Sequence, residues 1–289
     1  MTRLAEIQSH VASMTGLLDI VGAMRSLAGM RVQEAQRALP GIRRYADMMA
    51  AAIGAALPLL PEARPEGRRI VGRRAFVLCA AEHGFVGGFN ERLLEAANKM
   101  REPGDELFLL GTRGAMLAVE QGRNPAWSRP MATRLAMVPE TISALSAALY
   151  GRLMHGQVSR VEVVFARYRQ GRAAEIERRR LLPFEAETLP GDRPVQAPLH
   201  NLPPDMLLES LIAEYVFALL TEAAVESIAS ESAARFAAMQ AAHDNVSKKL
   251  DQLRQSARQA RQDDITTEML DLVTGSGALT ANGLETGAV

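Results

Sequence analysis

The chain has 289 residues, and its 33 basic and 33 acidic side chains give a formal net charge of zero. This balance leaves no global electric field that would recruit nucleic acid. Aromatic residues make up 4% of the chain, a scarcity that favours close helix–helix contact over a large aromatic core. The single cysteine, Cys79, excludes an internal disulfide framework and indicates a reducing compartment.

The two ends of the chain have the apolar repeat of long helices, and the segment between them does not. Residues 1–60 carry an apolar helical repeat, and residues 204–274 carry a second one, followed by an expected loose tail over 275–289. Residues 70–200 contain strand-like runs with frequent glycine and proline. Because a helix of about 65 residues spans roughly 100 Å, neither long helix can be buried inside one small globule.

The first long helix has an apolar seam on one face. Its members alternate at spacings of three and four, which is the a/d pattern of a coiled coil: Leu4, Ile7, Val11, Met14, Leu18 and Val21. A kink is expected at Pro40, and Pro58 is expected to end the helix. Since a single helix with such a seam is unstable in water, the first and last helices are predicted to pair as an antiparallel coiled coil.

The middle of the chain alternates strand and helix signals. Strands are expected over 75–81, 106–111, 161–168 and 177–184, and helices over 91–100, 114–121 and 139–155. This order predicts an open, Rossmann-like α/β sheet. The predicted fold class is therefore mixed α+β/α/β, a central open α/β domain joined to a coiled coil of the two terminal helices.

Five arginines lie in the segment 61–74, which is rich in proline and glycine: Arg64, Arg68, Arg69, Arg73 and Arg74. A basic run of this kind can bind nucleic acid, but no aromatic residues are interleaved with it. We therefore interpret the segment as a solvated hinge and expect no nucleic-acid partner.

The sequence contains no recognisable active site. The five histidines form no helical pair and none has a cysteine at metal-ligand spacing, so no metal site is expected. Motifs of the P-loop and of the nucleophile elbow are absent. We therefore predict a protein that is not an enzyme, with no catalytic residue, no metal and no cofactor.

A glycine-rich loop, Gly84–Asn90, follows a predicted strand and precedes a predicted helix. A phosphate can bind at such a helix N-terminus. The loop lacks a GxGxxG motif and a P-loop lysine, so a structural turn is favoured over a nucleotide site, and Gly111–Gly114 is interpreted in the same way. Cys79 lies in an apolar run with no adjacent basic residue, which favours an inert core thiol over a reactive nucleophile.

Membrane segments are not expected from the sequence. Polar residues from Glu6 to His10 interrupt any apolar core of a secretory signal. No unbroken run of about 18 apolar residues exists, so no direct insertion into a membrane is predicted. Any association with a membrane is expected to depend on partner proteins.

Three segments carry distinctive local motifs. Residues 231–245 read Glu-x-x-Ala-Arg-x-x-Ala-Met-x-x-Ala-x-x-Asn, and residues 261–268 read Arg-Gln-x-x-Ile-Thr-x-Glu. The loop at 84–90 has the spacing Gly-x-x-Gly-Gly-x-Asn, and residues 20–36 contain Ala-Met and Ala-Gln pairs. Together these segments, spread over nearly the whole chain, resemble the gamma subunit of F-type ATP synthases.

Some positions depart from the pattern of that family. Where the family usually has lysines near the first motif, this chain has Gly22, Met30 and Val32. Arg258 replaces an expected asparagine. These departures concern contacts with the catalytic subunits and indicate a divergent, bacterial-type member.

The resemblance implies a central rotor stalk that does no chemistry itself. The paired helices would lie inside an alternating hexamer of alpha and beta subunits, and the α/β domain would stand on the membrane rotor ring beside the epsilon subunit. Ion-driven rotation would bias the catalytic sites in turn toward ATP synthesis or hydrolysis. The protein would then be peripheral, on the cytoplasmic face of the inner (plasma) membrane.

The resemblance also implies which residues contact other subunits. They are Met24, Arg25, Arg235, Met239, Asn245, Arg261, Gln262, Thr266 and Glu268. For each of them, packing between the two long helices is the alternative. Two other functions stay open: a free-standing coiled-coil adaptor with a small α/β head, and an enzyme that binds nucleotide or phosphate at Gly84–Asn90.

Overall fold

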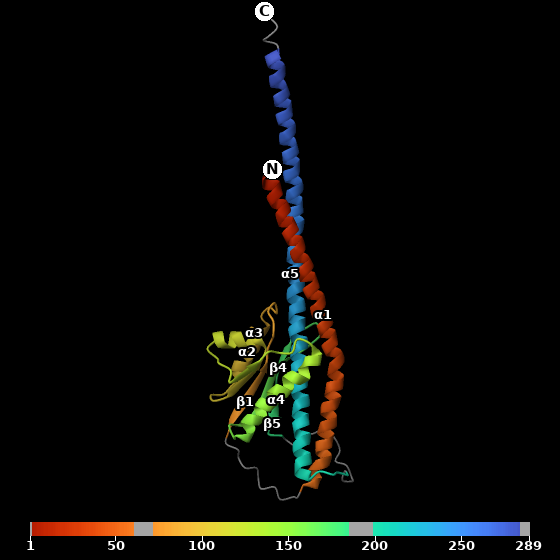
Figure 1. Ribbon diagram of the computed structural model, residues 1–289, viewed down its shortest axis with the longest axis vertical. Coiled ribbons are helices and arrows are strands. Elements are labelled where there is room, and N and C mark those ends of the chain that lie inside the picture. The colour runs from red at the N-terminus through yellow and green to blue at the C-terminus, as the bar shows by residue number, and fades with distance from the viewer. Residues whose placement is uncertain (1, 61–71, 185–198, 284–289) are drawn as a thin grey trace, which may run out of the picture. The chain divides into compact units, whose positions relative to one another are not determined.

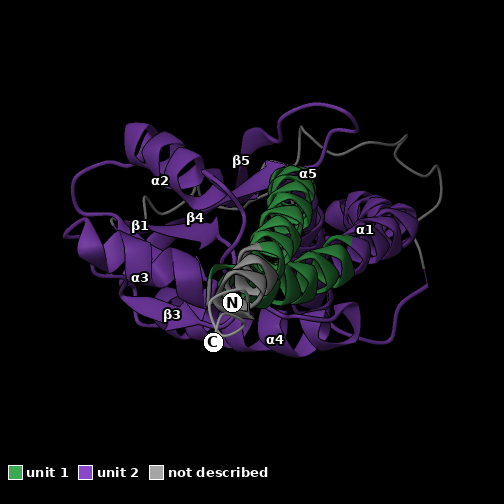
Figure 2. Cartoon of the chain, turned by 90° about the horizontal axis from the view of Figure 1, so that it is seen from above, with its two compact units in different colours: residues 1–25, 239–289 green, residues 26–238 purple. Residues whose placement is uncertain are grey.

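The computed structural model describes residues 2–60, 72–184 and 199–283 (Figure 1). The chain divides into two compact units (Figure 2). Unit 1 contains residues 1–25 and 239–289, and unit 2 contains residues 26–238. Both long helices contribute residues to both units, whereas the whole α/β sheet belongs to unit 2.

The two long helices are α1, Thr2–Ala56, and α5, Pro204–Gly283. Pro40 lies inside α1 and does not end it, and a short 3-10 turn, Leu57–Leu59, follows the helix as Pro58 predicted. The predicted end of the second helix at 274 is wrong, because α5 continues through the glycines at 275 and 277. An isolated glycine costs a helix only about 1 kcal/mol, which is too little to end it by itself.

Five strands form one sheet in the order β3-β2-β1-β4-β5. They are β1 Arg73–Cys79, β2 Glu106–Leu110, β3 Trp127–Arg129, β4 Val158–Arg167 and β5 Glu175–Leu182. The first four are parallel, and β5 pairs with β4 in the antiparallel direction. The predicted open α/β sheet is confirmed, and the last two strands pair across a short loop in which Gly171 has a positive φ of 70°.

Three shorter helices connect the strands: α2 Phe89–Met100, α3 Thr112–Glu120 and α4 Val138–Met154. Helices α2 and α3 cover one face of the sheet, where Phe76, Leu78 and Leu109 are fully buried. Helix α4 and parts of α1 and α5 cover the other face, around Phe108 and Phe165. Strands β1, β2 and β4 are therefore buried on both faces, as their apolar sequences require.

The turn between β2 and α3 depends on two glycines. Gly111 has a positive φ of 109°, and a Cβ there would lie 2.4 Å from the carbonyl oxygen of Ala80. A Cβ on Gly114 would lie 2.2 Å from the Cβ of Ala80. The tight βα turn predicted at Gly111–Gly114 is confirmed, because only glycine lets α3 begin this close to the end of β1.

The interpretation of the arginine segment needs a correction. Arg64, Arg68 and Arg69 lie outside the described residues, but Arg73 and Arg74 belong to β1. The Arg74 guanidinium is buried and pairs with Asp105 at 2.5 Å and with Glu162 at 3.0 Å. Arg74 is therefore a core ion-pair residue and not part of a solvated hinge.

The long helices run in opposite directions within unit 2. A Cβ on Gly29 of α1 would lie 3.5 Å from the Phe236 ring of α5. Further along α1, Arg43 pairs with Glu222, and Ile53 is buried together with Leu208 near the start of α5. The order of these contacts confirms the predicted antiparallel direction for this part of the pair.

One membrane-related finding differs from the sequence-based expectation. Among the described residues, one helical stretch, Arg3–Leu59, is long and apolar enough to cross a membrane by length and composition, with a mean hydropathy of 1.2 in its most apolar window. A membrane-spanning stretch can include up to two charged residues, so the finding is compatible with the absence of an unbroken apolar run. Helices of soluble proteins also meet it, so the finding is weak evidence of a membrane segment.

Candidate functional site

The place where α/β folds bind ligands is filled here by α5. In an open sheet, ligands bind outside the carboxyl ends of the strands, at the point where the strand order reverses. With the order β3-β2-β1-β4-β5, that point lies between β1 and β4. The side chains of α5 that enter this crevice, together with the strand ends they bind, form what we call the α5 joint.

Two serines of α5 hold the ends of β1 and β4. Ser227 donates a hydrogen bond of 2.8 Å to the carbonyl oxygen of Cys79, the last residue of β1. The same hydroxyl accepts a hydrogen bond of 3.4 Å from the backbone N–H of Ala166. Ser230 donates to the Ala166 carbonyl at 2.8 Å. Both serines are buried, so these bonds satisfy backbone groups that a ligand or water would otherwise satisfy.

Two buried glutamates extend the joint along α5. Glu226 accepts a hydrogen bond of 3.0 Å from the backbone N–H of Tyr168, just beyond β4, and also pairs with Arg43 of α1. Glu222 pairs with Arg43 at 2.9 Å and with Arg179 of β5 at 2.5 Å. Burial opposes ionisation of Glu222, but the two guanidinium groups outweigh it and hold its pKa below the ordinary value. Three elements are thus bound to one another through charged groups.

The glycine-rich loop, Gly84–Asn90, is also hydrogen-bonded to α5. Arg235 pairs with Glu231 at 2.6 Å and donates hydrogen bonds of 3.3 Å to the carbonyl oxygens of His83 and Gly84. Within the loop, Phe85 has a positive φ of 61° and an exposed side chain. Positive φ is costly for a bulky residue, and such strain is frequent at functional sites.

The helix N-termini near this loop already have carboxylate partners. Glu82 accepts hydrogen bonds from the backbone N–H and the hydroxyl of Thr112 at 2.9 and 2.7 Å, at the start of α3. It also accepts one from the N–H of Met131 at 2.8 Å. The first turn of α2 contains Glu91. Because carboxylates occupy or adjoin these positions, the geometry favours structural turns over phosphate binding.

Cys79 behaves as a core residue. Its side chain is fully buried, and this burial raises the pKa of the thiol to about 12. The thiolate, which is the nucleophilic form, is therefore disfavoured. This supports the interpretation of an inert core thiol. In the ranges that the structure describes, no group of three His, Cys, Asp or Glu side chains could hold a metal ion.

The residues predicted to contact other subunits fall into two groups. Four of them take part in packing within the chain: Arg25 donates a hydrogen bond of 2.9 Å to Gln240, Met24 is half-buried, and Arg235 and Met239 are buried. The other five are exposed on α5: Asn245, Arg261, Gln262, Thr266 and Glu268. Within the second group, the Thr266 hydroxyl donates to the Gln262 carbonyl at 2.9 Å. As contacts with partners, all nine stay predictions.

Sequence reasoning missed the residues of the α5 joint. Glu222 and Glu226 are four residues apart, and so are Ser227 and Glu231, so each pair lies on one face of a helix that also carries an apolar stripe. Polar residues repeated on an otherwise apolar face are a signal of buried hydrogen bonds. The structure alone shows the partners: Ser227 bonds to the ends of β1 and β4, whereas Glu222 pairs with Arg43 and Arg179.

The fold and the joint define a class of protein: an open α/β domain whose ligand crevice is closed by its own long terminal helix. A sequence model of the ATP synthase family matches residues 3–279. The ATP synthase gamma chain of Parafrankia sp. (strain EAN1pec) is 29% identical, with 96% of this chain and 98% of that protein covered. The gamma chain of Laribacter hongkongensis (strain HLHK9) is 25% identical, with 95% and 98% covered.

Solved structures show the same fold. A chain of the Euglena gracilis mitochondrial ATP synthase rotor matches with a TM-score of 0.61 and 15% identity, over 91% of this chain and 99% of that one. A chain of the central stalk and c-ring of the Tetrahymena thermophila enzyme matches with a TM-score of 0.54 and 14% identity, over 77% and 99%. Because the family model matches residues 3–279, the chain described here belongs to the ATP synthase family. Its curated relatives above are gamma chains.

Proposed function

We propose that this chain is the gamma subunit of an F-type ATP synthase, the central stalk that couples rotation of the membrane ring to the catalytic hexamer. The structural observation that best supports this proposal is the α5 joint. A helix that transmits torque must not slip against the domain that turns it. Buried serine and glutamate side chains bind α5 to the sheet at the position where related folds would bind a ligand.

We propose that the parts of α1 and α5 in unit 1 form an antiparallel coiled coil. In unit 1, the predicted seam residues from Leu4 to Leu18 are half-buried and Val21 is buried. On α5, the less exposed residues recur at spacings of four and three: Met239, His243, Val246, Leu250, Leu253, Ala257, Ala260 and Asp264. Two facing seams with heptad spacing are what knobs-into-holes packing requires.

The end of α5 is proposed to contact the inner surface of the alpha and beta subunits. Ile265, Met269 and Leu272 have 50%, 63% and 74% of their surface exposed. Exposed apolar residues in such number favour a protein partner over bulk water. Arg261, Gln262, Thr266 and Glu268 lie on the same segment and are proposed as polar contacts at this surface.

The proposed role as a central stalk also implies partners for the α/β domain, the absence of catalysis by this chain, and a location at the membrane. The α/β domain is proposed to contact the rotor ring and the epsilon subunit, and the exposed Phe85 in its strained loop is proposed as a contact with a catalytic subunit. The chain is proposed to be non-catalytic, because α5 fills the crevice where a substrate would bind. Its proposed location is the cytoplasmic face of the plasma membrane, as a peripheral part of the complex.

Co-purification tests this function. The full chain, tagged in its native host, is extracted under mild conditions and its bound proteins are identified. The expected result is recovery of alpha and beta subunits in a stable complex with ATPase activity. Recovery of the folded chain without these partners would favour the free-standing adaptor.

A paired variant makes the test specific. Changing Ile265→Asp together with Leu272→Asp places charge on the proposed apolar contact. It should weaken assembly by about tenfold or more, as expected for central interface residues. The control is Gln259→Asp, an exposed polar position on the same helix, which should assemble normally. Equal assembly of both variants would show that the end of α5 is not a subunit contact.

A further inference from the structure

A cavity of about 750 Å³ lies in unit 2, beside the α5 joint. Its lining residues come from α1, α2, α5 and the loop that joins β4 to β5. Small-molecule sites commonly measure about 300–1,000 Å³. Of the glycine-rich loop Gly84–Asn90, the lining includes Phe89 and no other residue. The cavity is therefore distinct from that loop and is large enough to bind a small organic molecule.

The charge of this cavity is positive. Arg92 of α2 lines it together with Arg169 and Arg172 of the β4–β5 loop, and the described residues of the lining include no aspartate or glutamate. Arg169 is paired with Glu175 at 2.8 Å, whereas the side chains of Arg92 and Arg172 have no ion-pair partner in the described ranges. Guanidinium groups match the geometry of phosphate and carboxylate oxygens. Two uncompensated guanidinium groups from different elements therefore favour an anion.

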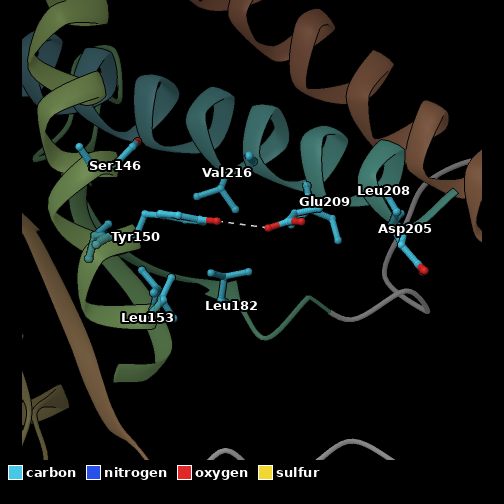
Figure 3. Close-up of a pocket in the computed structure, with 13 residues that line it drawn as sticks. Ser146, Tyr150, Leu153, Leu182, Asp205, Leu208, Glu209 and Val216 are labelled. Carbon is cyan, nitrogen blue, oxygen red and sulfur yellow. Dashed lines mark hydrogen bonds between the residues drawn. The ribbon is translucent and has the colours of Figure 1, made fainter. Parts of the chain in front are cut away.

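Another cavity of unit 2, between α4 and α5, has the opposite charge (Figure 3). Asp205 and Glu209 line it, and no lysine or arginine is present among the described residues of its lining. Glu209 accepts a hydrogen bond of 3.2 Å from the Tyr150 hydroxyl. An anion should therefore distinguish the two cavities, so that the one in Figure 3 serves as an internal control.

Aromatic side chains form part of the wall of the positive cavity. The Phe236 ring, on α5, is 41% exposed, and Tyr168, just beyond β4, is half-buried. The small side chains of Ala233 and Ala237 lie on the same helix as Phe236 and leave room beside its ring. Planar rings stack on accessible aromatic side chains. The lining thus suits a flat aromatic group.

Two amide side chains also line the cavity. Gln33 of α1 and Gln170 of the β4–β5 loop are exposed, and neither amide has a hydrogen-bond partner within the described residues. A primary amide presents a donor and an acceptor side by side, which match the edge of a nitrogen heterocycle such as adenine. These amides favour a heterocycle over a plain hydrocarbon ring.

We propose that this cavity binds a small heteroaromatic phosphate with the chemistry of a mononucleotide. Its phosphate group binds Arg92 and Arg172. Its ring lies against Phe236 and Tyr168, and the edge of the ring bonds to an amide of the lining. The inference goes beyond the proposed stalk function and does not depend on it, because it concerns binding by this chain alone.

Titration calorimetry with the full chain tests the proposal. The probe is adenosine monophosphate, which joins a phosphate to a nitrogen heterocycle. It should bind saturably at one site. Adenosine, which lacks the phosphate, and inorganic phosphate, which lacks the ring, should each bind at least about tenfold more weakly, because each makes only part of the contacts. Added salt should weaken the binding of the monophosphate, because it screens the guanidinium groups.

Variants assign the binding to this cavity. Arg92→Gln combined with Arg172→Gln should weaken binding by about tenfold or more, whereas Arg113→Gln, at an exposed arginine of α3 outside the cavity, should not change it. Ala237→Phe should abolish binding by filling the cavity. Its control is Ala213→Phe, at an exposed alanine of α5 that lines the cavity of Figure 3, and this variant should bind normally. Unfolding midpoints establish that each variant is folded.

Three results would overturn the proposal. The first is no saturable binding of the monophosphate, or equal binding of adenosine or phosphate, which would mean that charge and ring do not act together. The second is undiminished binding by Ala237→Phe or by the double arginine variant. The third is binding to the isolated chain together with equal binding by assembled complexes that contain the native or the Ala237→Phe chain, which would mean that a partner subunit covers the cavity.

Discussion

Ser227 of α5 donates its hydroxyl hydrogen to the carbonyl oxygen of Cys79, and the two residues are 148 positions apart in the sequence. The bond joins the helix to the end of the central strand, at the point where an open α/β sheet usually exposes its binding crevice. Together with Ser230 and Glu226, Ser227 thereby fills the crevice and fixes the position of α5 along the sheet.

Ser227→Ala should destabilise unit 2 by about 1–3 kcal/mol, because it leaves the Cys79 carbonyl and the Ala166 N–H without their partner in a buried place. Urea unfolding followed by the fluorescence of Trp127, the single tryptophan, measures the change. Ser210→Ala is the control, because Ser210 is an exposed serine of α5 that bonds only to its own helix. Equal effects of the two changes would contradict the role given to Ser227.

The joint should also affect coupling in the assembled enzyme. Ser227→Ala combined with Ser230→Ala loosens α5 against the sheet, so torque generated in the hexamer reaches the ring less completely. ATP hydrolysis should be retained while ATP-driven ion pumping falls, both measured well below the unfolding temperature. A parallel fall of hydrolysis and pumping would indicate damage to the hexamer contacts and not to the joint.

The ionised Glu222 carboxylate should contribute to the stability of unit 2 at neutral pH, and this contribution should be lost in acid. Its pKa is lowered in the folded state because Arg179 and Arg43 outweigh the effect of burial, so its contribution is present above the unfolded pKa of 4.5 and is lost as the pH falls through the folded value. The stability difference between the native chain and Glu222→Gln should therefore shrink as the pH is lowered below 4.5. Unfolding midpoints measured across that range test this, and a constant difference would contradict it.

Arg74 and Arg73 are adjacent in β1, but truncation of Arg74 should cost much more stability than truncation of Arg73. Arg74→Ala removes the buried guanidinium from Asp105, and it leaves Glu162 with the more distant Arg178 at 3.8 Å, at a cost of about 3–5 kcal/mol. Arg73 has 68% of its side chain exposed and lies 3.8 Å from Glu106, so Arg73→Ala should change stability by less than about 1 kcal/mol. Trp127 fluorescence during unfolding reports both, and similar costs would refute the assignment of Arg74 to the core.

Regular repetition made much of this fold predictable. The apolar run after Arg74 predicted a buried strand, and the seam from Leu4 to Val21 predicted the buried face of α1. The strand Trp127–Arg129 was missed because three residues are too few to show a period. The end of α5 was misplaced because a glycine weakens a helix without defining its last residue.

The α5 joint could not be predicted for a different reason. Ser227, Ser230 and Glu226 have polar side chains that suit a solvated helix face as well as a buried one. What decides between the two is the position of β1 and β4, which are far away in the sequence. The same holds for Arg74, whose partner Glu162 lies on a strand that pairs with β1 only in the folded sheet.

Cys79 should resist alkylation in the native protein. Burial raises the pKa of its thiol to about 12, so almost no thiolate exists near neutral pH, and the side chain is inaccessible. Iodoacetamide at pH 8 should leave the folded chain unmodified and label it fully in denaturant, as measured by intact mass.

The raised pKa of the Cys79 thiol also predicts that the stability of the folded chain falls at alkaline pH. The unfolded thiol ionises near its model value of 9.0 while the folded one stays protonated to about 12, so unfolding releases a proton between these values and stability falls as the pH rises. Cys79→Ala, whatever its cost at neutral pH, should remove this one-proton slope from the dependence of the unfolding free energy on pH. Rapid labelling of the folded chain, or an unchanged slope in the variant, would mean that the Cys79 thiol reaches solvent in the folded state.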